Sequence, residues 1–191
     1  MICYGFKGGS GTSSRVLDGP LKGYTVGVFV QCNCGRRPQL QIAGVPVGQK
    51  IPEYVPYAKG ASWIQEDVGS IIIVVATDAP ILPQQLKRLA RRATMGLART
   101  GSTSGNGSGD IFVAFSTANA EASKSSGLRD LKMLPNDEMN PLFEATVQAT
   151  EEAIVNALVA AETMTGVDDH RVIALPHQRL REVLKEYNKL Q

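Results

Sequence analysis

Long apolar runs and strong net charge are both missing from this sequence of 191 residues. No apolar stretch approaches the roughly 20 residues of a membrane-spanning helix, so we expect no membrane partner. The formal net charge of +2 is too small to indicate a nucleic-acid partner by itself. The first residues lack a basic segment followed by a long apolar stretch. No secretory signal is therefore visible, and we expect a cytoplasmic protein.

Cysteine and histidine are scarce. The cysteines are Cys3, Cys32 and Cys34, and the only histidines are His170 and His177. An odd number of cysteines without a disulfide-like framework favours a reducing compartment. Cys32 and Cys34 could form half of a metal site, but no second cysteine pair exists. We therefore expect small, partly buried thiols and no bound metal.

The composition is that of an ordinary globular protein, with 43% hydrophobic and 20% charged residues. A chain of this length can bury a substantial core, so residues 1–191 are expected to form a single domain.

The most informative stretch runs from Val68 to Asp78. Residues 71–76 are apolar and mostly β-branched, which predicts a buried strand. Gly69 and Ser70 stand immediately before it. Because glycine adopts backbone angles closed to other residues, strain could be stored at this peptide bond, beside a serine held at the edge of the sheet. This arrangement suits a serine that cuts its own chain, although a simple turn before a strand has the same sequence.

The chemistry of such a cut is specific. The hydroxyl of Ser70 attacks the carbonyl of Gly69, an ester forms, and water releases it. The new N-terminal Ser70 carries nucleophile and base together, because a free α-amine has a reference pKa of roughly 7.7–8.0.

Other segments alternate between strand and helix patterns. Strands are predicted at residues 24–31, 40–45 and 111–116, after a Gly/Ser loop at residues 4–15. Helices are predicted from Pro80 to about Leu97, from Pro141 to Thr165, and from Pro176 onward. Residues 49–67 are interpreted as a surface linker leading to Gly69. This order predicts an α+β fold with helices packed on sheet faces.

Three polar residues near strand ends are candidates for the site. The amide of Asn33 could donate to an oxyanion, although asparagine at this position is also a common turn residue. Ser108 and Asp110 stand two residues apart at a strand entrance, so they can point the same way and form a proton relay or an amine anchor. A flexible loop that ends in a turn aspartate remains an equal alternative.

The helix that begins near Pro80 carries a cluster of basic residues: Lys87, Arg88, Arg91 and Arg92. The cluster could form an anion- or RNA-binding patch, which would make the chain a nucleic-acid-binding module. A solvated helix face is the interpretation we favour.

Several long stretches resemble the self-cleaving L-aminopeptidase/D-esterase family, which includes the β-aminopeptidases. The resemblance covers nearly the whole chain and is that of the family's C-terminal part. The matching stretches are residues 5–9 with 11–15, 24–35, 42–48, 69–80, 105–119 and 174–177.

The resemblance implies an αββα sandwich like that of N-terminal nucleophile hydrolases, and a precursor cut before a serine. Gly69 and Ser70 match the cut. Ser108 and Asp110 match two catalytic residues of the family, and Asn33 matches its oxyanion asparagine. Residues 1–69 would then be a remnant of the α part, and residues 70–191 the β part.

The family also implies a function. Its members release N-terminal residues from short peptides, amides or esters that have a free N-terminal amine, they need no metal or organic cofactor, and they assemble as homo-oligomers, commonly tetramers of αβ units. Members carry a long segment before the region that matches Met1, so the sandwich is expected to be incomplete at the N-terminus. A truncated, inactive homologue that acts as an assembly partner is the alternative.

Overall fold

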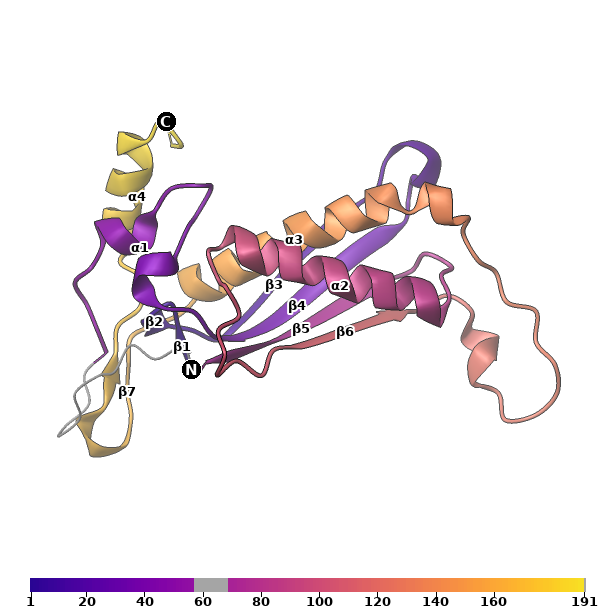
Figure 1. The fold of residues 1–191 in the computed structure, drawn as a ribbon, viewed down its shortest axis with the longest axis horizontal. Coiled ribbons are helices and arrows are strands. Elements are labelled where there is room, and N and C mark those ends of the chain that lie inside the picture. The colour runs from indigo at the N-terminus through magenta and orange to yellow at the C-terminus, as the bar shows by residue number, and fades with distance from the viewer. Residues whose placement is uncertain (57–68, 191) are drawn as a thin grey trace.

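The computed structural model describes residues 1–56 and 69–190. One four-stranded sheet forms its centre, in the order β3 (Ser10–Val16), β4 (Thr25–Asn33), β5 (Ser70–Thr77) and β6 (Ile111–Ser116). The first three strands are antiparallel neighbours, whereas β6 runs parallel to β5. The parallel pair needs a crossover, and α2 (Pro83–Arg99) provides it (Figure 1).

Alternating side chains place the core on one face of the sheet. Every second residue of β4 from Val26 to Cys32 is buried, as are Ile71, Ile73 and Val75 of β5. The helices α2 and α3 (Asn140–Val159) cover this face (Figure 1). The predicted strands at 24–31, 71–76 and 111–116 are confirmed, and so is the helix after Pro80.

Small residues let α3 lie close to the sheet. Ala145, Ala149, Ala153 and Ala157 of α3 are all buried. Opposite them, a Cβ added at Gly11 would lie 2.0 Å from the carbonyl oxygen of Ala153. The small-residue face of α3 therefore packs closely on β3.

The opposite face of the sheet remains exposed, and we call its apolar residues the open face. The open-face residues are between 40% and 53% exposed: Phe29, Ile72, Ile111, Val113 and Phe115. These residues form rows across the strands. Val74 of β5, for example, pairs with Phe29 of β4 on one side and with Val113 of β6 on the other. Apolar side chains on three adjacent strands thus form one contiguous patch.

Short elements gather at the end of the sheet where β5 begins (Figure 1). They are β1 (Ile2–Cys3), β2 (Phe6–Lys7), α1 (Val47–Lys50), β7 (Met164–Thr165), β8 (Arg171–Val172) and α4 (His177–Glu186). The last of these confirms the helix expected after Pro176.

Three expectations about local structure are wrong. Residues 4–15 contain β2 and most of β3 instead of a loop, because serine and threonine alternate there on an edge strand. Residues 40–45 form a tight turn with one bridge between Ile42 and Val45, and Ala43 and Gly44 have positive φ angles there. The helix expected to reach residue 165 ends at Val159. In the expected linker, residues 57–67 lie outside the described part of the chain.

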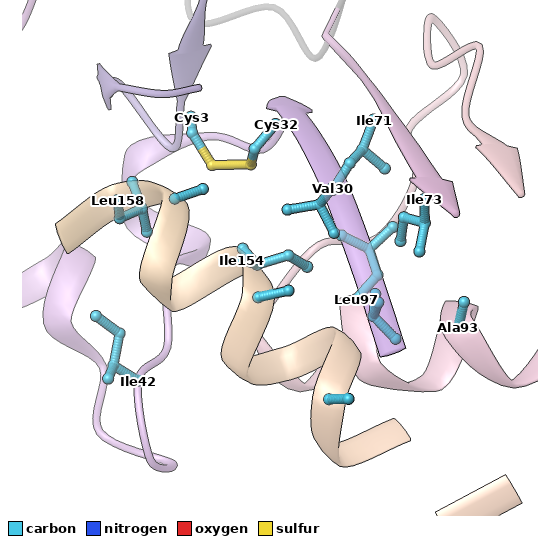
Figure 2. Close-up of a cluster of buried hydrophobic side chains, with 14 of the residues drawn as sticks. Cys3, Val30, Cys32, Ile42, Ile71, Ile73, Ala93, Leu97, Ile154 and Leu158 are labelled. Atoms are coloured by element: carbon cyan, nitrogen blue, oxygen red, sulfur yellow. A yellow bond between two sulfur atoms is a disulfide. The ribbon is translucent and has the colours of Figure 1, made fainter. Parts of the chain in front are cut away.

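The expectation of three thiols is also wrong. Cys3 and Cys32 form a disulfide across 29 residues, and both are fully buried (Figure 2). The fold brings β1 against the end of β4, a contact that the spacing of the cysteines did not indicate. The cysteine count therefore gives no argument for a reducing compartment. Over the described residues, no helix combines the length and apolarity needed to cross a membrane.

Candidate active site

Ser70 lies at the edge of the sheet, as the first residue of β5. It pairs across the strands with Asn33, the last residue of β4. Because Ile71 points into the core, Ser70 points to the opposite side, towards the open face. Its side chain is half-buried, and its Oγ accepts a hydrogen bond of 2.9 Å from the backbone N–H of Gly109.

Gly69 lies directly against the end of β4. A Cβ added there would be 2.3 Å from the carbonyl oxygen of Asn33 and 2.9 Å from Cα of Cys34. Real Cβ atoms do not approach backbone so closely, so only glycine fits at this position. The close approach gives a reason for glycine that does not depend on its backbone angles.

The carboxylate of Asp110 accepts three hydrogen bonds. Ser108 donates to Oδ1 over 2.6 Å, and the backbone N–H of Ile71 donates to the same oxygen over 3.0 Å. Ser104 donates to Oδ2 over 2.7 Å. Three donors hold the carboxylate in one orientation, because hydrogen bonds to a charged acceptor are short and strong. Ser108 and Asp110 are therefore bonded to each other, as their spacing allowed.

Ser104 is a candidate site residue that the sequence did not identify. Its backbone has a positive φ of 44°, and its N–H donates to the hydroxyl of Ser102 over 3.2 Å. That conformation aims its hydroxyl at Asp110. The stretch from Thr100 to Ser108 holds several hydroxyl groups, and nothing in their order indicates which one reaches the carboxylate.

Asn33 has one end of its amide already engaged. Its Oδ1 accepts a hydrogen bond of 2.8 Å from the backbone N–H of Ile2 in β1. The Nδ2 group is therefore the end of the side chain with protons to donate.

One end of the sheet thus collects the predicted residues. Ser70 and Asn33 are cross-strand neighbours, and Gly109, which bonds Ser70, stands between Ser108 and Asp110 in the chain. The proposed nucleophile, the hydroxyl–carboxylate pair and the amide come from β4, β5 and the loop before β6.

The basic cluster on α2 is partly used in packing. The guanidinium groups of Arg88 and Arg92 lie 5.1 and 3.9 Å from the ring centre of Phe143. Arg88 also donates to Asn136. Two of the four cations thus stack on α3, which favours the solvated-face interpretation.

Potential metal ligands cluster at one place among residues 1–56 and 69–190. The sulfur atoms of Cys3, Cys32 and Cys34 all lie within 4.8 Å of one another. Two of them form the disulfide, so in this state the cluster offers no three-thiolate site.

Comparison with known proteins identifies the family. The model of peptidase family S58 matches residues 1–172. The chain belongs to peptidase family S58. It is 52% identical to the beta-peptidyl aminopeptidase BapA of Sphingosinicella microcystinivorans, over 100% of this chain and 50% of the relative. With the protein of the same name from Sphingosinicella xenopeptidilytica, it shares 47% identity over 97% of this chain and 48% of the relative.

Solved structures agree with this assignment. The L-aminopeptidase D-Ala-esterase/amidase of Ochrobactrum anthropi, described as a variant of the Ntn hydrolase fold, superposes with a TM-score of 0.87 at 45% identity, covering 100% of this chain and 51% of that one. A beta-aminopeptidase of Burkholderia sp. superposes with a TM-score of 0.81 at 44% identity, covering 97% and 51%. The resemblance and the α+β fold of the N-terminal nucleophile hydrolase type are confirmed. The present chain of 191 residues spans about half the length of these relatives.

Proposed function

We propose that the chain carries the self-processing and catalytic centre of an S58 aminopeptidase. Ser70 cuts the chain after Gly69 and then acts as an N-terminal nucleophile on peptides, amides or esters with a free N-terminal amine. The observation that carries the proposal is the convergence on Ser70: its Oγ accepts the N–H of Gly109, its strand partner is Asn33, and Ser108 and Asp110 flank Gly109.

The first step is an acyl shift within the chain. Ser70 Oγ attacks the carbonyl carbon of Gly69, the C–N bond breaks, and the proton from the hydroxyl ends on the leaving nitrogen. The Gly109 N–H donates to the attacking oxygen and stabilises negative charge on it. Water then hydrolyses the ester. The products are a carboxylate at Gly69 and a free α-amine at Ser70.

Hydrolysis of a substrate uses the same chemistry, with Ser70 attacking a carbonyl group of the substrate instead of its own chain. The α-amine of Ser70 takes the hydroxyl proton, Oγ attacks the carbonyl of the substrate's N-terminal residue, and the protonated amine gives its proton to the leaving group. Water releases the acyl-enzyme. Asn33 Nδ2 and neighbouring backbone N–H groups bind the oxyanion.

Ser108 links the amine to Asp110. Because its hydroxyl proton is directed to Asp110, its oxygen is left to accept an N–H from the α-amine. The carboxylate favours a positive charge on the amine, and it therefore stabilises the protonated state that follows attack.

Substrate assays should begin with β-peptides, because two relatives are named beta-peptidyl aminopeptidases. We expect Ser108→Ala and Asp110→Asn to lower kcat by about 100-fold, while the circular dichroism spectrum and Tm stay close to those of the wild type. Thr103→Ala is the control, since the Thr103 hydroxyl accepts a hydrogen bond from Gln39 and is not one of the three donors to Asp110. Unchanged turnover in both site variants would contradict the relay.

A further inference from the structure

The Cys3–Cys32 disulfide lies one residue from the candidate oxyanion group. It joins β1 to the penultimate residue of β4, and Asn33 is the next residue in that strand. Figure 2 shows the bond between the two strands, to the left of the labelled side chains of Val30 and Ile71. Both sulfurs are buried among the residues of the main core.

A second connection joins the same two strands beside the disulfide. The backbone N–H of Ile2 donates to Asn33 Oδ1 over 2.8 Å. β1 therefore holds β4 by a covalent bond at Cys32 and by a hydrogen bond at Asn33. The hydrogen bond fixes which end of the amide can donate, and the covalent bond keeps Ile2 within reach.

Close packing at Gly8 shows how tightly these segments meet. A Cβ at Gly8 would lie 2.7 Å from Cβ of Cys3 and 2.5 Å from the carbonyl oxygen of Cys32. β1 pairs with β2 at only two positions, Ile2 with Lys7 and Cys3 with Phe6, and the residue after it, Tyr4, donates its backbone N–H to the carbonyl oxygen of Cys34. Ile2 lies on the N-terminal side of that bond, so loss of the crosslink lets the first residues open more often, and local opening also exposes the disulfide to a reductant.

We propose that the Cys3–Cys32 disulfide is a reversible redox site that positions Asn33 for catalysis. The proposal rests on the function proposed above, because it assigns Asn33 to the oxyanion. With the bond intact, Ile2 orients the amide and Nδ2 faces the reacting carbonyl. With the bond reduced, β1 moves away from β4 more often, and the amide loses its fixed orientation.

The reductant is a dithiol. One of its thiolates attacks a sulfur of the disulfide, the Cys3–Cys32 bond breaks, and a mixed disulfide forms. Its second thiol displaces the remaining cysteine, and the reductant leaves as its own disulfide. Two electrons and two protons thereby pass to Cys3 and Cys32, which end as thiols.

Cys34 supplies a matched control. Its Sγ lies 3.7 Å from that of Cys32, but the disulfide does not include it. The variant Cys34→Ser keeps the disulfide, whereas Cys3→Ser removes it and leaves two cysteines. Alkylation before and after reduction, followed by peptide mass mapping, identifies which cysteines are bonded in each protein.

The test compares the oxidised chain of residues 1–191 with the same chain reduced by a dithiol. We expect reduction to lower kcat about 10-fold with KM changed less than twofold, and reoxidation to restore it. Cys3→Ser should behave like reduced wild type and ignore the dithiol, while Cys34→Ser should respond like wild type. A positioning role for β1 also predicts faster hydrogen exchange at the Ile2 amide on reduction.

Two results would overturn the proposal: three alkylated thiols in the protein before reduction, or an Ile2 exchange rate and kcat that reduction leaves unchanged. If neither redox state hydrolyses any substrate, the proposed function fails, but the exchange rate still decides the positioning role. Faster Ile2 exchange on reduction would support that role, and an unchanged rate would remove it.

Discussion

Three hydrogen bonds hold the carboxylate of Asp110, and two of them come from serine hydroxyl groups. Ser108 and the Ile71 N–H share Oδ1, and Ser104 alone bonds Oδ2. Without Ser104 the carboxylate can rotate, so its charge no longer stays directed at Ser108. We therefore propose Ser104 as a positioning residue.

We expect Ser104→Ala to reduce kcat about 10-fold, since the chemical groups remain and only their orientation loosens. Ser104→Asn, which tolerates the left-handed backbone and keeps a side-chain donor, should recover part of the activity. Wild-type turnover in Ser104→Ala would contradict the assignment.

Arg37 is a buried cation, with 5% of its surface exposed. It donates to the carbonyl oxygens of residues 4, 5, 51, 53 and 54, and it lies 3.3 Å from the ring centre of Phe6. Burial lowers its pKa to about 10, with Glu53 opposing the shift, so it stays charged at neutral pH. Arg37 thereby joins the segment before β2 to the segment that leads towards Gly69.

Replacing Arg37 by methionine should lower the free energy of unfolding by about 3 kcal/mol, because several buried carbonyl groups lose their donors at once. Arg36→Met is the control, since Arg36 is exposed. Its effect should stay within about 0.5 kcal/mol. Urea unfolding of both variants measures the difference, and similar midpoints would remove Arg37 as an organising residue.

Some of these residues can be predicted from the sequence, and others cannot. Ser108 and Asp110 are predictable because a spacing of two at a strand entrance is local information. Ser104 and Arg37 act through partners set by the fold: a left-handed turn in one case, and five carbonyls from two distant segments in the other. Cys3 belongs to the same class, since its partner lies 29 residues away.

Among the secondary-structure elements, α2 and α3 depend on a close crossing at Gly96. A Cβ there would lie 2.5 Å from Cβ of Thr150 and 2.6 Å from the carbonyl oxygen of Val147. Both neighbours belong to α3, and the second is backbone, so neither can rotate away.

Gly96→Ala should therefore destabilise the protein by roughly 1–3 kcal/mol, even though alanine favours helix. Gly27→Ala is the matched control, because a Cβ at Gly27 meets nothing within 4 Å on the open face. That variant should be neutral or slightly more stable than the wild type. Thermal unfolding compares them, and a stabilised Gly96→Ala would contradict the crossing.

The sequence predicts the elements whose apolar residues follow a clear pattern. The β-branched run of β5 and the apolar spacing of α2 each indicate one structure only. The edge strand β3 carries glycine, serine and threonine, so its sequence resembles that of a loop until a neighbouring strand is known. At residues 40–45, the positive φ angles of Ala43 and Gly44 turn the chain where its apolar residues suggested a strand.

At the scale of the whole molecule, the proposed cut falls between two paired strands. β4 and β5 pair over eight residues, from Val26 with Thr77 to Asn33 with Ser70. Breaking the bond after Gly69 would leave these pairs in place. The two products, residues 1–69 and 70–191, should therefore remain one folded unit even though no peptide bond joins them.

The open face predicts self-association of the isolated chain. Its large apolar residues are contiguous, and such a patch favours a partner over water. In sedimentation velocity, the variant Val113→Lys/Phe115→Lys should shift the protein towards the monomer. Leu128→Lys, a change at a residue that is 98% exposed and outside the sheet, should not. If the wild type and both variants sediment identically, the open face does not mediate self-association.

The most direct test of the central claim is the intact mass of the purified protein beside that of Ser70→Ala. We predict two species in the wild type, residues 1–69 and residues 70–191, which co-elute under native conditions and separate when denatured. The variant should show one uncut chain. A single uncut chain in both proteins, or cleavage that persists in Ser70→Ala, would contradict the assignment of Ser70 as a self-cleaving nucleophile.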